Sequence, residues 1–308
     1  MKVIIVGPGA IGCLFGGLLT EAGNDVYMLD NNPLRASDIS KNGIQIAGMG
    51  GERSVPAKVE SDPARLPEAD FTLMCVKAYD TLEAAKHALP AINLGKCVVS
   101  IQNGLGNIEQ IAATVPGKPI IAGTTSQGST SLGFGRIRHA GTGITLLSAV
   151  TPDASTRAAV EELANTLNKA RLATETTPDF NSILWGKAVL NAGLNPVTAI
   201  WGVPNGAIIT RDALRQVAFA AVTEAAKVAA AMNVQLPYHD AIAQFERLCT
   251  FTAPNFSSML QDVNHHRRTE IDAINGYITR QGRKLNIPVP VNEMLIGRIR
   301  EREMKFVL

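Results

Sequence analysis

The sequence has few of the features that mark nucleic-acid-binding, membrane or disulfide-rich proteins. Its formal net charge is only +2 and no run of lysine and arginine reaches five residues, which argues against nucleic acid or acidic lipid as a partner. No uninterrupted apolar stretch reaches the roughly 20 residues that a membrane-spanning helix needs. The four cysteines form no CxxC pair and have no zinc-site spacing. We therefore expect buried free thiols in a cytoplasmic protein without a metal.

Length and composition are those of a globular protein with two domains. The chain has 308 residues, of which 46% are hydrophobic and 18% are charged. The run from Val3 to Leu19 is largely apolar and follows Lys2, as in a signal peptide, but it contains five glycines. We expect it to form a strand, a glycine turn and a helix.

The first half of the chain alternates short β-rich runs with helical ones, which predicts a parallel sheet covered on both faces. An Ala-Gly-Thr turn at residues 140–142 predicts a hairpin, Asp153 is a candidate helix cap, and a short strand could close the sheet. The expected strands are Lys2–Val6, Asp25–Leu29, Phe71–Val76, Val98–Ile101, Ile120–Ala122, Arg136–His139, Gly143–Leu147 and Arg171–Thr174. The expected helices are Ala10–Glu21, Thr81–Leu89, Ile108–Thr114 and Ala154–Ala170.

Strand-like runs disappear after Pro178, and helical patterns separated by proline or glycine take their place. The expected helices are Phe180–Asn195, Asp212–Met232, His239–Thr250, Asn255–Gln281 and Asn292–Lys305. We therefore predict an α/β Rossmann-type dinucleotide-binding domain over residues 1–177 and an all-α substrate domain over residues 178–308.

The strongest local signal is a glycine-rich turn between the first strand and the first helix. Its six residues are Gly7, Pro8, Gly9, Ala10, Ile11 and Gly12, in the order G-x-G-x-x-G. The first glycine allows the tight turn, the second lets a pyrophosphate approach the backbone, and the third allows close packing of helix on sheet. Free N–H groups at the helix start suit phosphate. The pattern predicts a nicotinamide dinucleotide site, the alternative being a glycine turn of another α/β fold.

Asp30 ends the second predicted strand, 18 residues after Gly12. An acid there would accept hydrogen bonds from the adenosine ribose and repel a 2′-phosphate, which favours NAD(H) over NADP(H). The other reading of Asp30 is a surface residue that opens the turn ending at Pro33. Arg35 lies near enough to compensate a phosphate, so NADP(H) stays open.

Three polar residues, Lys187, Asn191 and Asn195, recur every four positions on an otherwise apolar helix. They therefore lie along one face, which needs polar partners or a wet cleft. A lysine ammonium can stabilise and protonate the oxygen of a ketone that is being reduced, and amides can orient the substrate. The alternative is a lysine that extends to solvent beside asparagines with local hydrogen bonds.

The sequence around these residues resembles the signature of the ketopantoate reductases, the 2-dehydropantoate 2-reductases of pantothenate biosynthesis. The similar segments are Leu184–Lys187, Asn191, Asn195–Trp201, Pro204–Gly206, Asn255–Asp262, Thr269–Gly276, Val76–Ala78, Gln102–Gly104 and Ile287–Pro290. These segments are spread along the chain, and the resemblance covers nearly all of it. The resemblance implies reduction of ketopantoate to (R)-pantoate with a nicotinamide cofactor.

The resemblance also implies roles for individual residues. Lys187 would be the proton donor, and Glu270 would bind the cofactor near the nicotinamide ribose, although its surroundings alone suggest a solvated residue paired to Arg267 or Arg268. Substrate would be held by Asn103, Lys187, Asn191, Asn195, Asn205, Asn255 and Ser258. The cofactor would be held by the glycine turn, Asp30, Lys77, Asn103 and Glu270. No metal is implied, and a homodimer is compatible with the sequence without being specified by it.

Asp30 departs from the family pattern, because NADP(H)-using members commonly have an arginine at or beside this position. Members of the same fold group with an acid at this position can resemble NAD-dependent D-2-hydroxyacid dehydrogenases. The second hypothesis is that this protein is such a dehydrogenase. A dinucleotide sensor without turnover is the third, but it has no need of a complete substrate site.

Overall fold

The computed structural model of the protein describes residues 1–151 and 153–306, which form two compact units. The sheet unit consists of Met1–Gln102 and Asn107–Phe180, and the helical unit joins Asn103–Gly106 to the chain from Asn181 onward. In the described ranges, no helix has the length and hydrophobicity needed to cross a membrane.

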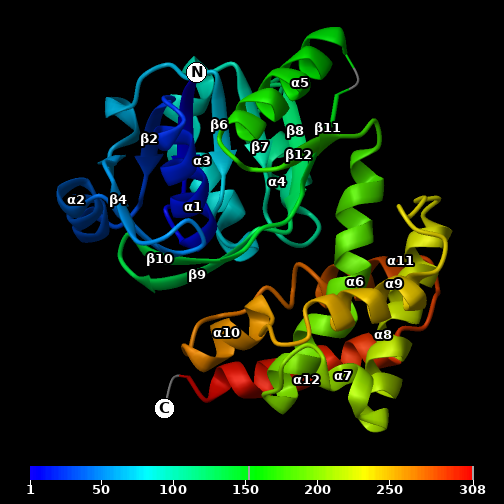
Figure 1. Ribbon diagram of the computed structural model, residues 1–308. Helices are drawn as coiled ribbons and strands as arrows, with labels where there is room; N and C mark the ends of the chain where they lie inside the picture. The colour runs from blue at the N-terminus through cyan, green and yellow to red at the C-terminus, as the bar shows by residue number, and fades with distance from the viewer. Residues whose placement is uncertain (152, 307–308) are drawn as a thin grey trace. The chain divides into compact units, whose positions relative to one another are not determined.

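The main sheet of the sheet unit has eight strands in the order β12-β11-β8-β7-β6-β1-β2-β5 (Figure 1). All neighbours run parallel except β11, which is antiparallel to β8. The strands are β1 (Lys2–Val6), β2 (Asp25–Leu29), β5 (Lys58–Glu60), β6 (Phe71–Met74), β7 (Cys97–Ser100), β8 (Ile120–Thr125), β11 (Thr145–Ala149) and β12 (Thr174–Thr176). The predicted α/β class is therefore confirmed, although β11 and β12, which are parallel to each other, run opposite to the other six strands.

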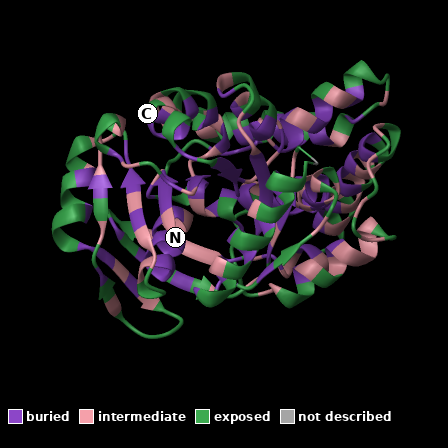
Figure 2. Cartoon of the chain, turned by 90° about the horizontal axis from the view of Figure 1, so that it is seen from above, coloured by how far each residue is buried: buried purple, intermediate pink, exposed green. Residues whose placement is uncertain are grey.

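Helices cover both faces of this sheet, so its central strands are buried throughout (Figure 2). Val3 and Ile5 pack in a core with α1 (Ala10–Glu21) and α5 (Ala154–Lys169), which Asp153 caps as predicted. The other helices of the unit are α2 (Pro33–Asn42), α3 (Thr81–Leu94) and α4 (Asn107–Thr114), with short 3-10 turns at Pro63–Arg65 and Ala78–Asp80.

Helix α1 lies between the main sheet and a second sheet, which has the order β4-β3-β10-β9 (Figure 1). This second sheet contains β3 (Ile44–Gly48), β4 (Arg53–Val55), β9 (Gly128–Gly133) and β10 (Arg136–Gly141). A Cβ added at Gly16 would lie 2.0 Å from Met28 of the main sheet, and one at Gly17 would lie 2.8 Å from Ile46 of the second. Because a sheet packs against each side of α1, its sequence is apolar and rich in glycine.

The hairpin predicted around residues 140–142 is wrong. Strand β10 pairs with β9 and β3, whereas β11 pairs with β8 in the other sheet. Gly143 is needed for a close approach, because a Cβ there would lie 2.4 Å from the carbonyl oxygen of Ser126. The real hairpin turns between β9 and β10 at Gly135, whose φ is +62°.

The helical unit contains α6 (Phe180–Trp201), α7 (Ala207–Thr210), α8 (Asp212–Ala231), α9 (Ala241–Phe251), α10 (Ser258–Asn264), α11 (Asn275–Lys284) and α12 (Pro290–Met304). Helix α6 continues past Pro196, beyond the predicted end at Asn195. The single helix predicted over Asn255–Gln281 is wrong. Ser257 caps a new helix through Leu260 N–H, and His266 leaves helical geometry with a φ of +51°.

Candidate active site

The glycine turn after β1 is shaped by contacts within the sheet unit. Gly7 has a φ of +92° and donates its N–H to Leu29 O at 3.0 Å. A Cβ at Gly7 would lie 2.5 Å from Val76, and one at Gly12 would lie 2.2 Å from Gly7 O. Both positions therefore require glycine because protein atoms fill the space beside them.

Gly9 differs from its neighbours because, apart from Gly9 itself and the adjoining backbone, no atom of the described residues lies within 4 Å of a Cβ added there. It is exposed and is the N-cap residue of α1, which has no side-chain cap and no acidic residue in its first turn. Uncapped N–H groups at a helix start bind anionic oxygens, and the open side of Gly9 leaves room for them. The turn thus fits the pyrophosphate of a dinucleotide.

Two substitutions are expected to separate these functions of the turn. Gly9→Val should leave the thermal unfolding midpoint unchanged but weaken dinucleotide binding at least tenfold, because its side chain enters the open space. Gly12→Ala should lower the free energy of unfolding by about 1–3 kcal/mol through overpacking against Gly7. Calorimetry and dinucleotide titration measure both, and unchanged affinity in Gly9→Val would contradict a pyrophosphate site at this turn.

Lys77 follows β6 at the point where the strand order of the sheet reverses, between β1 and β6. Ligands of open α/β sheets bind outside the strand ends at such a point. The half-buried Lys77 is close in sequence to Cys75, whose N–H donates to Val6 O at 2.9 Å. The predicted cofactor residue thus lies at the same sheet edge as the glycine turn.

A buried network, missed by the sequence analysis, holds the segment before Lys77 in place. The Gln102 amide donates to Val76 O at 2.9 Å and to Thr81 Oγ1 at 2.8 Å. Thr81 donates in turn to Asn107 Oδ1 at 2.9 Å. The feature of the sequence that could have indicated Gln102 is its place in the segment Gln102–Gly104, which resembles the family.

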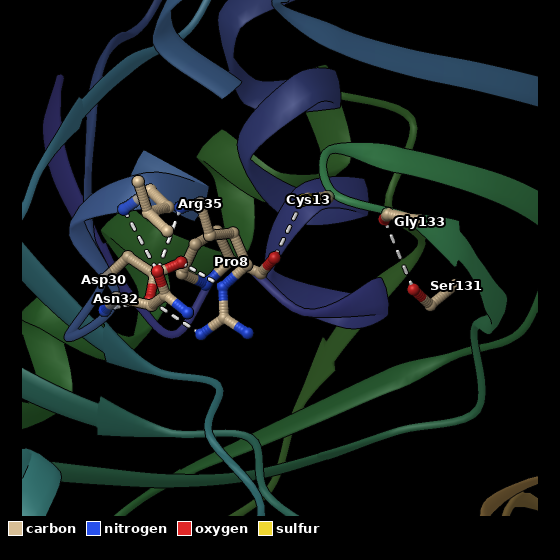
Figure 3. A network of polar contacts seen from close by, with 8 residues as sticks. Pro8, Cys13, Asp30, Asn32, Arg35, Ser131 and Gly133 are labelled. Atoms are coloured by element: carbon tan, nitrogen blue, oxygen red, sulfur yellow. Dashed lines mark hydrogen bonds and ion pairs between the residues drawn. The ribbon is translucent and has the colours of Figure 1, made fainter. Parts of the chain in front are cut away.

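Asp30 is buried and its carboxylate is occupied by the protein (Figure 3). Its two oxygens accept hydrogen bonds from Nε and Nη2 of Arg35, and Oδ1 also accepts the Asn32 N–H at 2.9 Å. The Asp30 side chain is 0% exposed and that of Arg35 is 34% exposed. The group that reaches solvent here is therefore a guanidinium rather than a carboxylate.

Within the helical unit, Lys187, Asn191 and Asn195 lie on α6, as their spacing predicts. Burial lowers the pKa of Lys187 to about 8, against the opposing effect of the Glu270 carboxylate. Asn195 is almost fully buried and Asn191 half-buried, yet neither side chain is hydrogen-bonded to another residue of the described chain. Buried amides normally have partners, so these two are suited to hold a polar ligand.

Glu270 and Asn103 belong to the same helical unit as Lys187. Glu270 is buried, and Asn103 Nδ2 lies 3.5 Å from its Oε2. The segment after Asn103 is anchored by the Leu105 N–H, which donates to Ala273 O at 2.8 Å. The reading of Glu270 as a solvated residue is wrong, since the chain folds it inward.

The remaining predicted substrate residues are Asn205, Asn255 and Ser258, on the segments around α7 and α10. Asn205 is buried, its N–H donates to Asn255 O at 2.9 Å, and its amide donates to Thr252 Oγ1 at 2.9 Å. Its Oδ1 is buried and has no hydrogen-bond partner among the residues that the structure describes. Asn255 and Ser258 are exposed, and Ser257, which the sequence analysis did not single out, is buried. Ser257 joins Thr198 of α6 through a 2.6 Å hydroxyl contact.

Two models of one protein family match the two parts of the chain. Residues 3–152 match the family model for the ketopantoate reductase PanE/ApbA, and residues 179–303 match the model of its C-terminal part. A 2-dehydropantoate 2-reductase of Pyrococcus abyssi is 34% identical over 305 residues, which cover 98% of each chain.

Two solved structures share the whole fold. A PanE/ApbA family ketopantoate reductase from Ralstonia eutropha has a TM-score of 0.90 and 32% identity, with both chains fully covered. D-mandelate dehydrogenase, in a ternary structure with NADH and anilino(oxo)acetate, has a TM-score of 0.91 and 26% identity over the full length of both chains. The chain therefore belongs to the ketopantoate reductase family, whose members are nicotinamide-dependent reductases.

Proposed function

We propose that this protein is a 2-dehydropantoate 2-reductase, which reduces ketopantoate to (R)-pantoate in pantothenate biosynthesis. The observation that carries the proposal is the combination of Lys187, its pKa lowered to about 8, with Glu270 and two buried or half-buried amides on the same helix face. The 34% identity to a reductase of this name supports the choice of substrate.

The chemistry follows from the charges that develop during reduction. A nicotinamide held by the glycine turn, Lys77, Asn103 and Glu270 would supply hydride to the ketone carbon, and negative charge would develop on the ketone oxygen. The Lys187 ammonium stabilises that charge and donates its proton, so that a hydroxyl group forms and the amine recovers a proton from solvent. Asn191 and Asn195 donate N–H groups to the substrate carboxylate and carbonyl, which fixes the ketone relative to Lys187.

We assign the other predicted residues to binding of the dinucleotide and the keto acid. Residues 1–177 bind the dinucleotide through the glycine turn and Lys77, and residues 178–308 bind the keto acid. Asn103 contacts both ligands, and Glu270 binds the nicotinamide ribose. Asn205 offers its unpartnered Oδ1 to the substrate and holds the Asn255 segment, from which Asn255 and Ser258 close over the substrate.

The second candidate is a dehydrogenase of bulkier D-2-hydroxy acids, favoured by the structural similarity to D-mandelate dehydrogenase. Comparison of kcat/KM for ketopantoate and phenylglyoxylate decides between them. We expect at least a tenfold preference for ketopantoate, and a preference for phenylglyoxylate would favour the second candidate. Dinucleotide binding without oxidation by either acid would favour a sensor instead.

For the cofactor we propose NADP(H), because Arg35 rather than Asp30 faces solvent at the end of β2. Asp30 holds the guanidinium through two hydrogen bonds, and Arg35 keeps N–H groups for a 2′-phosphate. The pair thus reverses the preference for NAD(H) that the acid alone suggests. A ribose hydroxyl could reach Asp30 only if Arg35 moved away.

Arg35→Ala is expected to lower kcat/KM for NADPH by about 10–100-fold, the value of a hydrogen-bonded charge pair, and to change that for NADH less than threefold. The matched control is Lys41→Ala, which removes an exposed cation from the last turn of the same helix, α2. Equal losses for NADPH and NADH in Arg35→Ala would contradict a 2′-phosphate contact.

The buried free thiols of Cys13, Cys97 and Cys249 support a cytoplasmic location, where thiols stay reduced. A homodimer remains a prediction that light scattering of the purified protein tests directly.

A further inference from the structure

Helix α6 lacks one backbone hydrogen bond because Pro196 lies inside it. Proline has no N–H, so the carbonyl of Ala192, four residues earlier, receives no helical donor from position 196. The side-chain amide of Asn275 donates to this carbonyl at 3.0 Å, and all three residues are buried. We infer that Asn275 is a positioning residue, which replaces the missing helix bond and fixes the part of α6 that carries Asn191 and Asn195.

Asn275 is itself held by a buried network that reaches three other helices. Its second N–H donates to Asn292 Oδ1 at 2.9 Å. Asn292 donates to Ala221 O at 3.1 Å and to Glu224 Oε2 at 2.8 Å, and Glu224 also accepts the Asn292 N–H at 3.0 Å. The network links α6 through α11 and α12 to α8, so the amide that supports Ala192 has a fixed position.

The same side chain ties α6 to the segment that carries Glu270. Asn275 begins α11 five residues after Glu270, and the turn between them is closed by Ala273 and Ile274, whose N–H groups both donate to Glu270 O at 3.1 Å. Ala192 directly follows Asn191. Asn275 therefore fixes the position of the Glu270 segment relative to the part of α6 that carries Asn191 and Asn195. This role for Asn275 rests on the proposed function.

The hydrogen bonds of Asn275 show why an amide is needed at this position. Both N–H groups donate hydrogen bonds, whereas Oδ1 is buried and accepts none from residues 1–151 or 153–306. The side chain thus acts as a double donor to Ala192 O and Asn292 Oδ1. A carboxylate cannot donate in this way, and alanine leaves two buried acceptors unpaired.

The link to Pro196 is tested by a double-mutant cycle on thermal unfolding, which needs no substrate. Asn275→Ala is expected to lower the midpoint by about 5 °C. Pro196→Ala restores an N–H that can donate to Ala192 O, so in that background the loss should shrink to less than half. If Asn275→Ala does not fold alone, recovery of folded protein in the double variant supports the same conclusion. Equal losses in both backgrounds would overturn it.

The effect on the site is tested by kinetics with ketopantoate and NADPH. Asn275→Ala should lower kcat/KM for the keto acid by about tenfold or more, as for a misplaced substrate contact, with a smaller change of about threefold or less in the dissociation constant for NADPH. The control is Thr279→Val on the same helix, which removes a buried hydrogen bond to Gly276 O and should leave kcat/KM within twofold. An equal kcat/KM for the two variants would overturn the positioning role. Absence of turnover in the unmodified protein would refute the proposed function and leave the unfolding cycle valid.

Discussion

Replacement of Lys187 by alanine is expected to lower the turnover of ketopantoate at least about a hundredfold, the usual contribution of a general acid. The reason is that the variant removes the proton donor and the positive charge that meets the developing alkoxide. Dinucleotide binding should persist, because the glycine turn belongs to the sheet unit. Steady-state rates and a separate dinucleotide titration measure the two quantities.

The matched control is Lys227→Ala, which removes an exposed lysine from α8 in the same unit. It should retain turnover within twofold. Near-normal turnover in Lys187→Ala would show that the proton comes from elsewhere and would remove the basis for the assigned chemistry. Loss of both turnover and dinucleotide binding would point to misfolding, which circular dichroism detects.

The second large effect concerns pH. Reduction needs Lys187 protonated, and burial lowers its pKa to about 8 from the ordinary value of 10.5. We therefore expect kcat/KM for the keto acid to be level below pH 8 and to fall tenfold per pH unit above it. Oxidation of the hydroxy acid should show the opposite trend, because it needs the neutral amine. A profile that stays level to pH 10 would contradict the desolvated lysine.

Glu270→Gln is expected to move this descending limb to lower pH. The Glu270 carboxylate favours the charged ammonium and so raises the pKa of Lys187, and its removal leaves the effect of burial unopposed. Glu293→Gln serves as the control, because Glu293 is exposed on α12 and pairs with Arg283. A limb that moves to higher pH in Glu270→Gln would contradict the proximity of the two charges.

The sequence was most informative where local patterns decide the structure. The strand, glycine turn and helix from Lys2 to Glu21 lie as predicted, because residue periodicity and turn chemistry are local. The hairpin at residues 140–142 failed because pairing across two sheets is set by distant strands, not by the turn. The helix predicted over Asn255–Gln281 failed because the helical pattern did not show the break between α10 and α11, where His266 has a φ of +51°.

In the candidate site, too, local patterns predicted some residues, and others depend on tertiary packing. A four-residue spacing is enough to place Lys187, Asn191 and Asn195 on one helix face. Glu270 could be selected only through family resemblance, since its burial depends on tertiary packing. The contact of Asn275 with Ala192 spans 83 residues, and no local pattern could have indicated it.

The most direct test of the proposed reaction is reduction of ketopantoate with NADPH deuterated at the transferred position of the nicotinamide, followed by NMR of the product. We expect pantoate with deuterium at C2 and stoichiometric oxidation of the cofactor, both formed at least about a hundredfold more slowly by Lys187→Ala. Cofactor that binds to the unmodified protein but is not oxidised by ketopantoate would contradict it.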